Sequence, residues 1–170
     1  MTTLTVRQLS TVLVLAIAAL PYTAAAQTEV TGIRAMGMGE AFTANPAGAG
    51  ALTLNPAGIS ALHMYSIETS YAHDTATGVN SLHLSVTDGK SNPRLGGGVG
   101  YSFRTSSEEA TLADFTGHDF YGALAFPVVA EWLIVGSTIH YLDYELQGTS
   151  YAKGVTMDAG LLVMLGDFVS

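Results

Sequence analysis

The sequence predicts an all-β protein, an antiparallel transmembrane β-barrel of which this chain carries about six strands. Three observations predict this class. Apolar and polar side chains alternate in segments of about 10 residues, the length that a tilted strand needs to cross a bilayer. Beyond residue 26 no run of 18 apolar residues occurs, so spanning helices are not expected. The 19 glycines and 8 tyrosines are typical of barrel strands and their aromatic girdles.

Composition excludes several other classes. The chain is 48% hydrophobic and only 12% charged, which excludes an intrinsically disordered protein. Its formal net charge of -8 would repel a phosphate backbone, so no nucleic-acid partner is expected. Without cysteine the chain has no disulfide, no thiolate metal site and no cysteine nucleophile.

Residues 1–26 have the features of a secretory signal peptide. Arg7 precedes an apolar run at 9–20, and small residues end at Ala26. The run is too short to cross a membrane as a helix. The mature chain is therefore expected to begin at Gln27 and to lie outside the inner membrane.

Residues 27–62 are rich in glycine, alanine and Asn-Pro pairs and show no strand period. Two Asn-Pro-Ala-Gly copies, at 45–48 and 55–58, each predict a turn, because proline presets φ and asparagine can bond its own backbone. A compact segment of this composition before a barrel predicts a hatch, or plug, inside the lumen.

Residues 63–170 are expected to supply the first barrel strands, with their apolar faces outward. The period-two segments are 64–73, 79–88, 95–104, 118–127, 132–145 and 155–165. The connectors 74–78, 105–117 and 146–154 are together longer than those between them, which predicts long loops on one side of the membrane. A secreted β-sandwich packed on a second sheet would give the same alternation.

Six strands cannot close a barrel, since the smallest have about 8. We therefore expect the chain to be the N-terminal part of a longer barrel, or to borrow strands from other copies. The last residues, 167–170, resemble a turn and the start of a seventh strand.

Charged and histidine side chains within the strands are expected to face the lumen. These are Glu68, His83, Arg104, His140 and Asp158. Burial favours their pairing with one another or with Arg34 and Glu40 of the hatch. The histidines show no metal-binding spacing and those inside strands are expected on inner faces, so neither a metal nor another cofactor is predicted.

Residues 96–100 contain a glycine run, and the sequence lacks known catalytic motifs. Gly96, Gly97, Gly98 and Gly100 form GGGVG, but a strand and not a helix follows, which argues against a phosphate loop. Glycine within a strand more often marks a bulge or a close approach of another backbone. Neither GxSxG nor HExxH occurs, and an enzyme is not expected.

Two stretches carry a family resemblance. Residues 34–42, RAMGMGEAF, and 54–59, LNPAGI, follow a signal peptide and precede the first strand. At these residues the chain resembles the long-chain fatty acid transporter family of outer-membrane proteins and its PorV-type relatives. The resemblance implies a fourteen-stranded barrel in the outer membrane of a Gram-negative bacterium, with an N-terminal hatch and a hydrophobic passage that opens sideways.

The resemblance also implies roles and partners. The hatch segment Asn55, Pro56, Ala57 and Gly58 would gate the passage, and the glycine run would mark the lateral opening in the third strand. The expected function is passive uptake of long-chain fatty acids or similar lipids, in contact with outer-membrane lipid. The alternative is a PorV-type barrel that anchors or shuttles secreted proteins and binds no small molecule.

Overall fold

A computed structural model describes residues 46–75, 77–106, 114–129 and 132–164. The expected signal peptide, the 34–42 motif and the residues after 164 lie outside this part. Two short helices come first: α3 at Ala49–Thr53 and α4 at Gly58–Ala61. Within the described residues, neither helix nor any other is long and apolar enough to cross a membrane.

Six strands follow and form one sheet. They are β1 Tyr65–Asp74, β2 Val79–Asp88, β3 Gly96–Ser106, β4 Phe115–Val129, β5 Leu133–Leu146 and β6 Thr149–Val163. Each strand pairs antiparallel with the next, in the order β1-β2-β3-β4-β5-β6. The all-β class and the antiparallel six-strand arrangement are thus confirmed. The sheet does not close on itself in the part of the chain that the structure describes.

The largest error in the predicted strand boundaries is at β6, and β4, expected at 118–127, spans Phe115–Val129. The loop expected at 146–154 is a two-residue turn, and β6 begins at Thr149. Gln147 and Gly148 both have positive φ, 52° and 70°, which is the geometry of a tight hairpin turn. A register shift at Tyr144 and Glu145 breaks the alternation there, which hid the strand from the period-two pattern. The predicted contrast in loop length between the two ends of the sheet is correspondingly weaker.

The two faces of the sheet differ in polarity. We call the face against which α3 and α4 pack the inner face, and the other the outer face. Buried polar side chains gather on the inner face: Ser81, His83, Ser85, Thr87, Ser102, Asp119, Thr138 and His140. Exposed apolar side chains stand on the outer face: Ile67, Leu84, Val99, Phe120, Leu124, Ile139, Met157 and Leu161. This is the reverse of a sheet whose apolar face forms a core.

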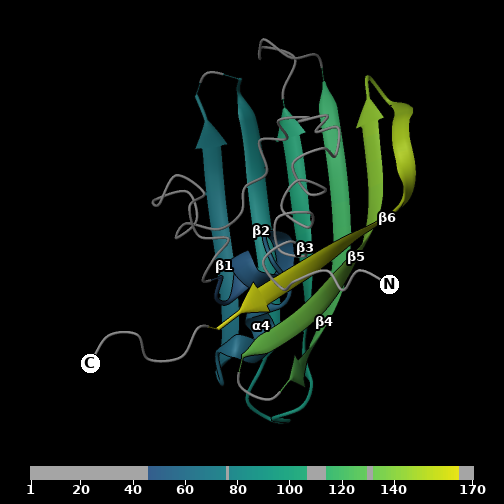
Figure 1. The fold of residues 1–170 in the computed structure, drawn as a ribbon. Coiled ribbons are helices and arrows are strands. Elements are labelled where there is room, and N and C mark those ends of the chain that lie inside the picture. Colours follow the sequence, from purple (N-terminus) through teal and green to yellow (C-terminus); the bar gives the residue numbers. More distant parts are fainter. Residues whose placement is uncertain (1–45, 76, 107–113, 130–131, 165–170) are drawn as a thin grey trace, which may run out of the picture.

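The helical segment, residues 46–62, lies within the curl of the sheet (Figure 1). In the lower half of that view β4, β5 and β6 bend across and enclose it. The apolar core is small and sits between the segment and the middle strands; it consists of Ala51, Leu52, Ile59, Tyr121, Ala123 and Ala125. The fold therefore places a short, non-strand segment against an otherwise polar surface.

Candidate functional site

The second Asn-Pro-Ala-Gly copy forms the predicted turn and also holds the segment to the sheet. The Asn55 side-chain oxygen accepts a hydrogen bond from the Ala57 amide at 3.2 Å, and the Gly58 amide donates to the Asn55 carbonyl at 3.0 Å. The Asn55 side-chain nitrogen donates to the carbonyl of Leu161 in β6 at 3.1 Å. Asn55 is only 7% exposed, so one side chain shapes the turn and joins it to the far strand.

Two more side chains tie the segment to β3, β4 and β5. The Ser60 hydroxyl donates to the Ala125 carbonyl at 2.8 Å and accepts from the Gly96 amide at 3.0 Å. The Thr138 hydroxyl, fully buried, donates to the Leu52 carbonyl at 2.9 Å. The Thr138 bond satisfies a carbonyl that the five-residue helix α3 leaves open, while the Ser60 bonds satisfy backbone groups of β3 and β4.

Glycines in the strands make room for this close contact. A Cβ atom added to Gly136 would lie 2.6 Å from the amide nitrogen of Ala57, and one added to Gly96 would lie 2.7 Å from the Ser60 hydroxyl. A Cβ at Gly98 would lie 2.9 Å from the Leu52 side chain. Any larger residue at these positions would push the segment away from the wall.

The glycine run therefore has an observed role on the inner face. Gly96 and Gly98 face the segment, and Gly100 lies beneath the ring of Tyr121. Gly97 is on the outer face, paired with Leu124. From Gly96 to Ser106, β3 pairs continuously with β4, and from Gly97 to Ser106 it also pairs with β2. A lateral opening at this strand stays a prediction.

A cluster of buried polar groups lines the inner face beside the segment. The Tyr121 hydroxyl lies 2.8 Å from Nδ1 of His83, and the Ser102 hydroxyl lies 3.1 Å from the same nitrogen. Nδ1 of His140 is 3.1 Å from both carboxylate oxygens of Asp119. The rings of Tyr121 and His140 are 5.2 Å apart, which joins the two pairs into one cluster.

All five side chains expected to face the lumen occupy inner-face positions. His83 and His140 are buried, and Nε2 of His140 lies 3.1 Å from the carboxylate of Asp158, so this pairing occurs. Glu68 accepts a hydrogen bond from Ser66 at 3.0 Å. Arg104 is opposite Ser81 on the same face. The structure does not bring all five together, because they are spread over five strands.

Three members of the cluster were missed from the sequence. Asp119 directly follows His118 in the sequence, but consecutive strand residues point to opposite faces. His118 is on the outer face, where its Nδ1 lies 2.8 Å from the Tyr101 hydroxyl. The expectation that the strand histidines all face inward is therefore wrong for His118, and also for His73. Tyr121 and Ser102 share the polar face and could have been found from the alternation.

Metal binding finds no support in the described ranges, where no three His, Asp or Glu side chains are placed to hold an ion. Comparison of the chain with protein-family models, curated proteins and solved structures finds no match. The features that bear on function are therefore the two faces of the sheet and the segment 46–62 that packs against the inner face.

Proposed function

We propose that this chain forms part of the wall of an outer-membrane β-barrel that lets hydrophobic molecules, such as long-chain fatty acids, cross passively, with residues 46–62 as its hatch. One observation carries the proposal. A small apolar cluster lies between the hatch and the wall, with Leu52 and Ile59 of the hatch against Ala123 and Ala125 of the inner face. Movement of the hatch would uncover an apolar surface on a wall that is otherwise polar.

The outer face has the grading expected of a surface in lipid. One row across the sheet is entirely apolar or glycine: Ile67, Val86, Val99, Gly122, Ile139 and Met157. The next row is largely aromatic and aliphatic: Thr69, Leu84, Tyr101, Phe120, Tyr141 and Val155. Two rows further the residues are polar: His73, Asn80, Thr105, Thr116 and Glu145. An apolar band bordered by aromatic and then polar residues is typical of membrane barrels.

The border of this band at the start of β1 and the end of β2 crosses the strands obliquely, as tilted strands require. On β1 the apolar residues end at Tyr65, opposite Asp88. On β5 and β6 they continue two rows further, to Leu133 and Val163. A band that shifts along the strands from one edge of the sheet to the other would lie level in a bilayer if the strands tilt by about 35–45°.

In the part of the chain that the structure describes, β1 and β6 are the two edge strands of the sheet, and a membrane location requires a partner for each edge. Unpaired backbone groups cannot face lipid without a cost of several kcal/mol each by order of magnitude. Further strands, from the same protein or from other copies, would have to pair with these edges. The polar inner face would then border an aqueous lumen.

The ties that hold the hatch are weak enough to be broken in function. The Asn55, Ser60 and Thr138 side chains supply its hydrogen bonds to the strands. Each hydrogen bond is worth about 0.5–1.5 kcal/mol net. Together these bonds favour the closed position over the open one by a few kcal/mol of free energy. A hydrophobic ligand that binds the uncovered apolar surface would offset much of this difference.

A reversible lock tests the proposal directly. The sequence has no cysteine, so Ser60→Cys with Ala125→Cys would introduce a single pair, next to the existing Ser60 to Ala125 hydrogen bond. Oxidation should stop uptake of labelled long-chain fatty acid by cells that carry the protein, and reduction should restore it. Each single cysteine variant, with and without oxidant, is the matched control.

Uptake that is equal in the oxidised and reduced protein, with the disulfide verified, would contradict the hatch. The PorV-type alternative predicts a different pattern: secretion components co-purify, no fatty acid is bound, and the lock has no effect on uptake.

A further inference from the structure

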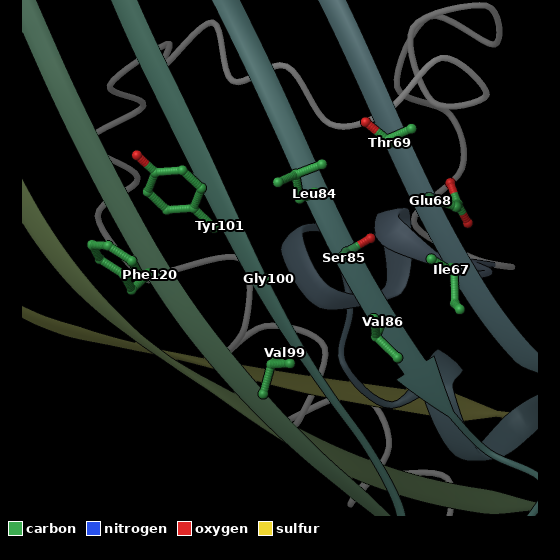
Figure 2. A pocket seen from close by; sticks show the side chains of 10 residues that line it. All are labelled: Ile67, Glu68, Thr69, Leu84, Ser85, Val86, Val99, Gly100, Tyr101 and Phe120. Carbon is green, nitrogen blue, oxygen red and sulfur yellow. The ribbon is translucent and has the colours of Figure 1, made fainter.

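The outer face has a hollow that the proposed function does not use. An apolar groove of about 440 Å³ crosses β1 to β4 on this face. Its walls are the side chains of Ile67, Leu84, Val86, Val99, Tyr101 and Phe120, which stand on the side of the sheet away from the helical segment (Figure 2). The groove is therefore separate from the hatch and its apolar cluster.

A glycine lies next to this hollow, beside its lining residue Val99. Gly122 is opposite Val99 in the register and shares its row on the outer face. Among the described residues, the one heavy atom within 4 Å of a Cβ added there would be the Gly98 carbonyl oxygen, at 3.9 Å. The absence of a side chain at this position leaves open space between Val99 and Ile139.

Positive charge is concentrated at one end of the groove. The chain has only six Lys and Arg residues and is acidic as a whole. Two of them, Lys90 and Arg94, are exposed in the short connection between β2 and β3. These two strands carry residues that line the groove. The single acidic side chain at the end of β2, Asp88, accepts hydrogen bonds from the amides of Lys90 and Ser91 at 2.9 Å. Residues 88–94 therefore carry two cationic side chains and one anionic side chain.

The spacing between the groove and these cations fits one kind of molecule. From Leu84 to Asp88, where β2 ends, is four residues, or about 13 Å at about 3.3 Å per residue, and Lys90 follows two residues later. Because the strands tilt, the depth in the bilayer between Leu84 and the cations is less than the distance along the chain. This depth is close to the thickness of one leaflet, about half of the roughly 30 Å hydrocarbon core. An acyl chain in the groove would place a phosphate beside Lys90 and Arg94.

We propose that the outer face binds a phospholipid with an anionic headgroup, its acyl chain in the groove over β1–β4 and its phosphate at Lys90 and Arg94. The inference rests on the membrane location in the proposed function but not on transport. Basic side chains next to a membrane-embedded apolar surface select anionic lipids by charge. The apolar groove supplies the contact that holds one lipid in place.

The test measures lipids retained by the purified full-length protein. The protein is exposed to vesicles containing equal amounts of phosphatidylglycerol and phosphatidylethanolamine, re-purified in mild detergent, and its bound lipids are identified by mass spectrometry. We expect phosphatidylglycerol to be enriched. Lys90→Gln with Arg94→Gln should lower that enrichment by about tenfold or more, since two cations are lost.

Two further variants separate the groove from general charge. Gly122→Leu fills open space and should abolish retention of both lipids while the protein still folds and inserts. Lys153→Gln removes a cation that pairs with Asp143 at the opposite end of the sheet, and should leave the enrichment unchanged.

The inference is overturned if the unmodified protein retains the two lipids equally, if Lys153→Gln has the same effect as the double variant, or if Gly122→Leu still retains lipid. A groove covered by a second copy of the chain, seen as a dimer without lipid, would also overturn it. Fatty-acid uptake is measured separately, so either proposal can fail while the other holds.

Discussion

Strand β4 shows side by side how the two faces of the molecule differ. Asp119 and Ala125 are buried on the inner face at 5% and 0% exposure, while Phe120 and Leu124 on the outer face are 51% and 58% exposed. Hydrophobicity alone would have placed these residues the other way round. What decides burial here is which side of the sheet the segment 46–62 covers, and the function we propose places lipid, not a protein core, against the outer face.

A charge in the middle of the outer face should break this contrast most strongly. Ile139→Arg puts a cation in the all-apolar row, and we expect it to destabilise the vesicle-embedded protein by about 2–4 kcal/mol. Thr105→Arg, in the polar row, is the matched control and should cost little. Urea unfolding in vesicles measures both. Equal stabilities would place the outer face in water.

Crowding the inner face should release the segment without disturbing the outer face. Gly136→Ala forces a Cβ against the backbone of Ala57, and overpacking of this kind costs about 1–3 kcal/mol. Amide hydrogen exchange at 50–60 should become faster. Gly154→Ala in β6, where an added Cβ meets nothing within 4 Å, is the control. Unchanged exchange in Gly136→Ala would mean that the segment does not rest on β5.

Matched hydrogen bonds on the two faces of β5 sharpen the comparison. Thr138→Val removes the buried bond to the Leu52 carbonyl and should loosen the segment by about 1 kcal/mol. Ser137→Ala removes an exposed bond of the same length, 2.9 Å, to the Asp158 carbonyl. Only the first variant should speed exchange at Leu54, whose amide bonds within the segment. The same effect from both would remove the distinction between the faces.

The smallest effect is expected at the exposed pair of Lys153 and Asp143. Its ends are 2.7 Å apart, but both side chains are accessible to solvent, which screens the attraction. Lys153→Gln should leave the urea midpoint of the embedded protein within error. A clear loss of stability would indicate that this end of the outer face is shielded from water.

The parts of this arrangement that could be predicted from the sequence are those with a local sequence pattern. The segment 79–88 alternates strictly, and the structure places β2 at the same residues. The turn at Asn55 follows from its own Asn-Pro-Ala-Gly sequence. The bond from Asn55 to Leu161 joins residues 106 positions apart, and no local pattern encodes it.

Other features were lost because the alternation breaks. Residues 149–154 contain a register shift, together with Lys153 and Gly154, so the first part of β6 resembled a loop in the sequence. The pairing of Asp119 with His140 depends on the register between β4 and β5, which hydrophobic pattern alone does not fix to the residue.

The contact of the outer face with lipid is tested most directly by the fluorescence of a tryptophan placed in its apolar row by Ile139→Trp, with Trp132, the only tryptophan in the sequence, replaced by phenylalanine. The protein is placed in vesicles whose phospholipids carry bromine on the acyl chains, and quenching is compared with that by iodide in water. We predict strong quenching by the brominated lipid and weak quenching by iodide. Strong quenching by iodide with none from the brominated lipid would contradict the membrane location.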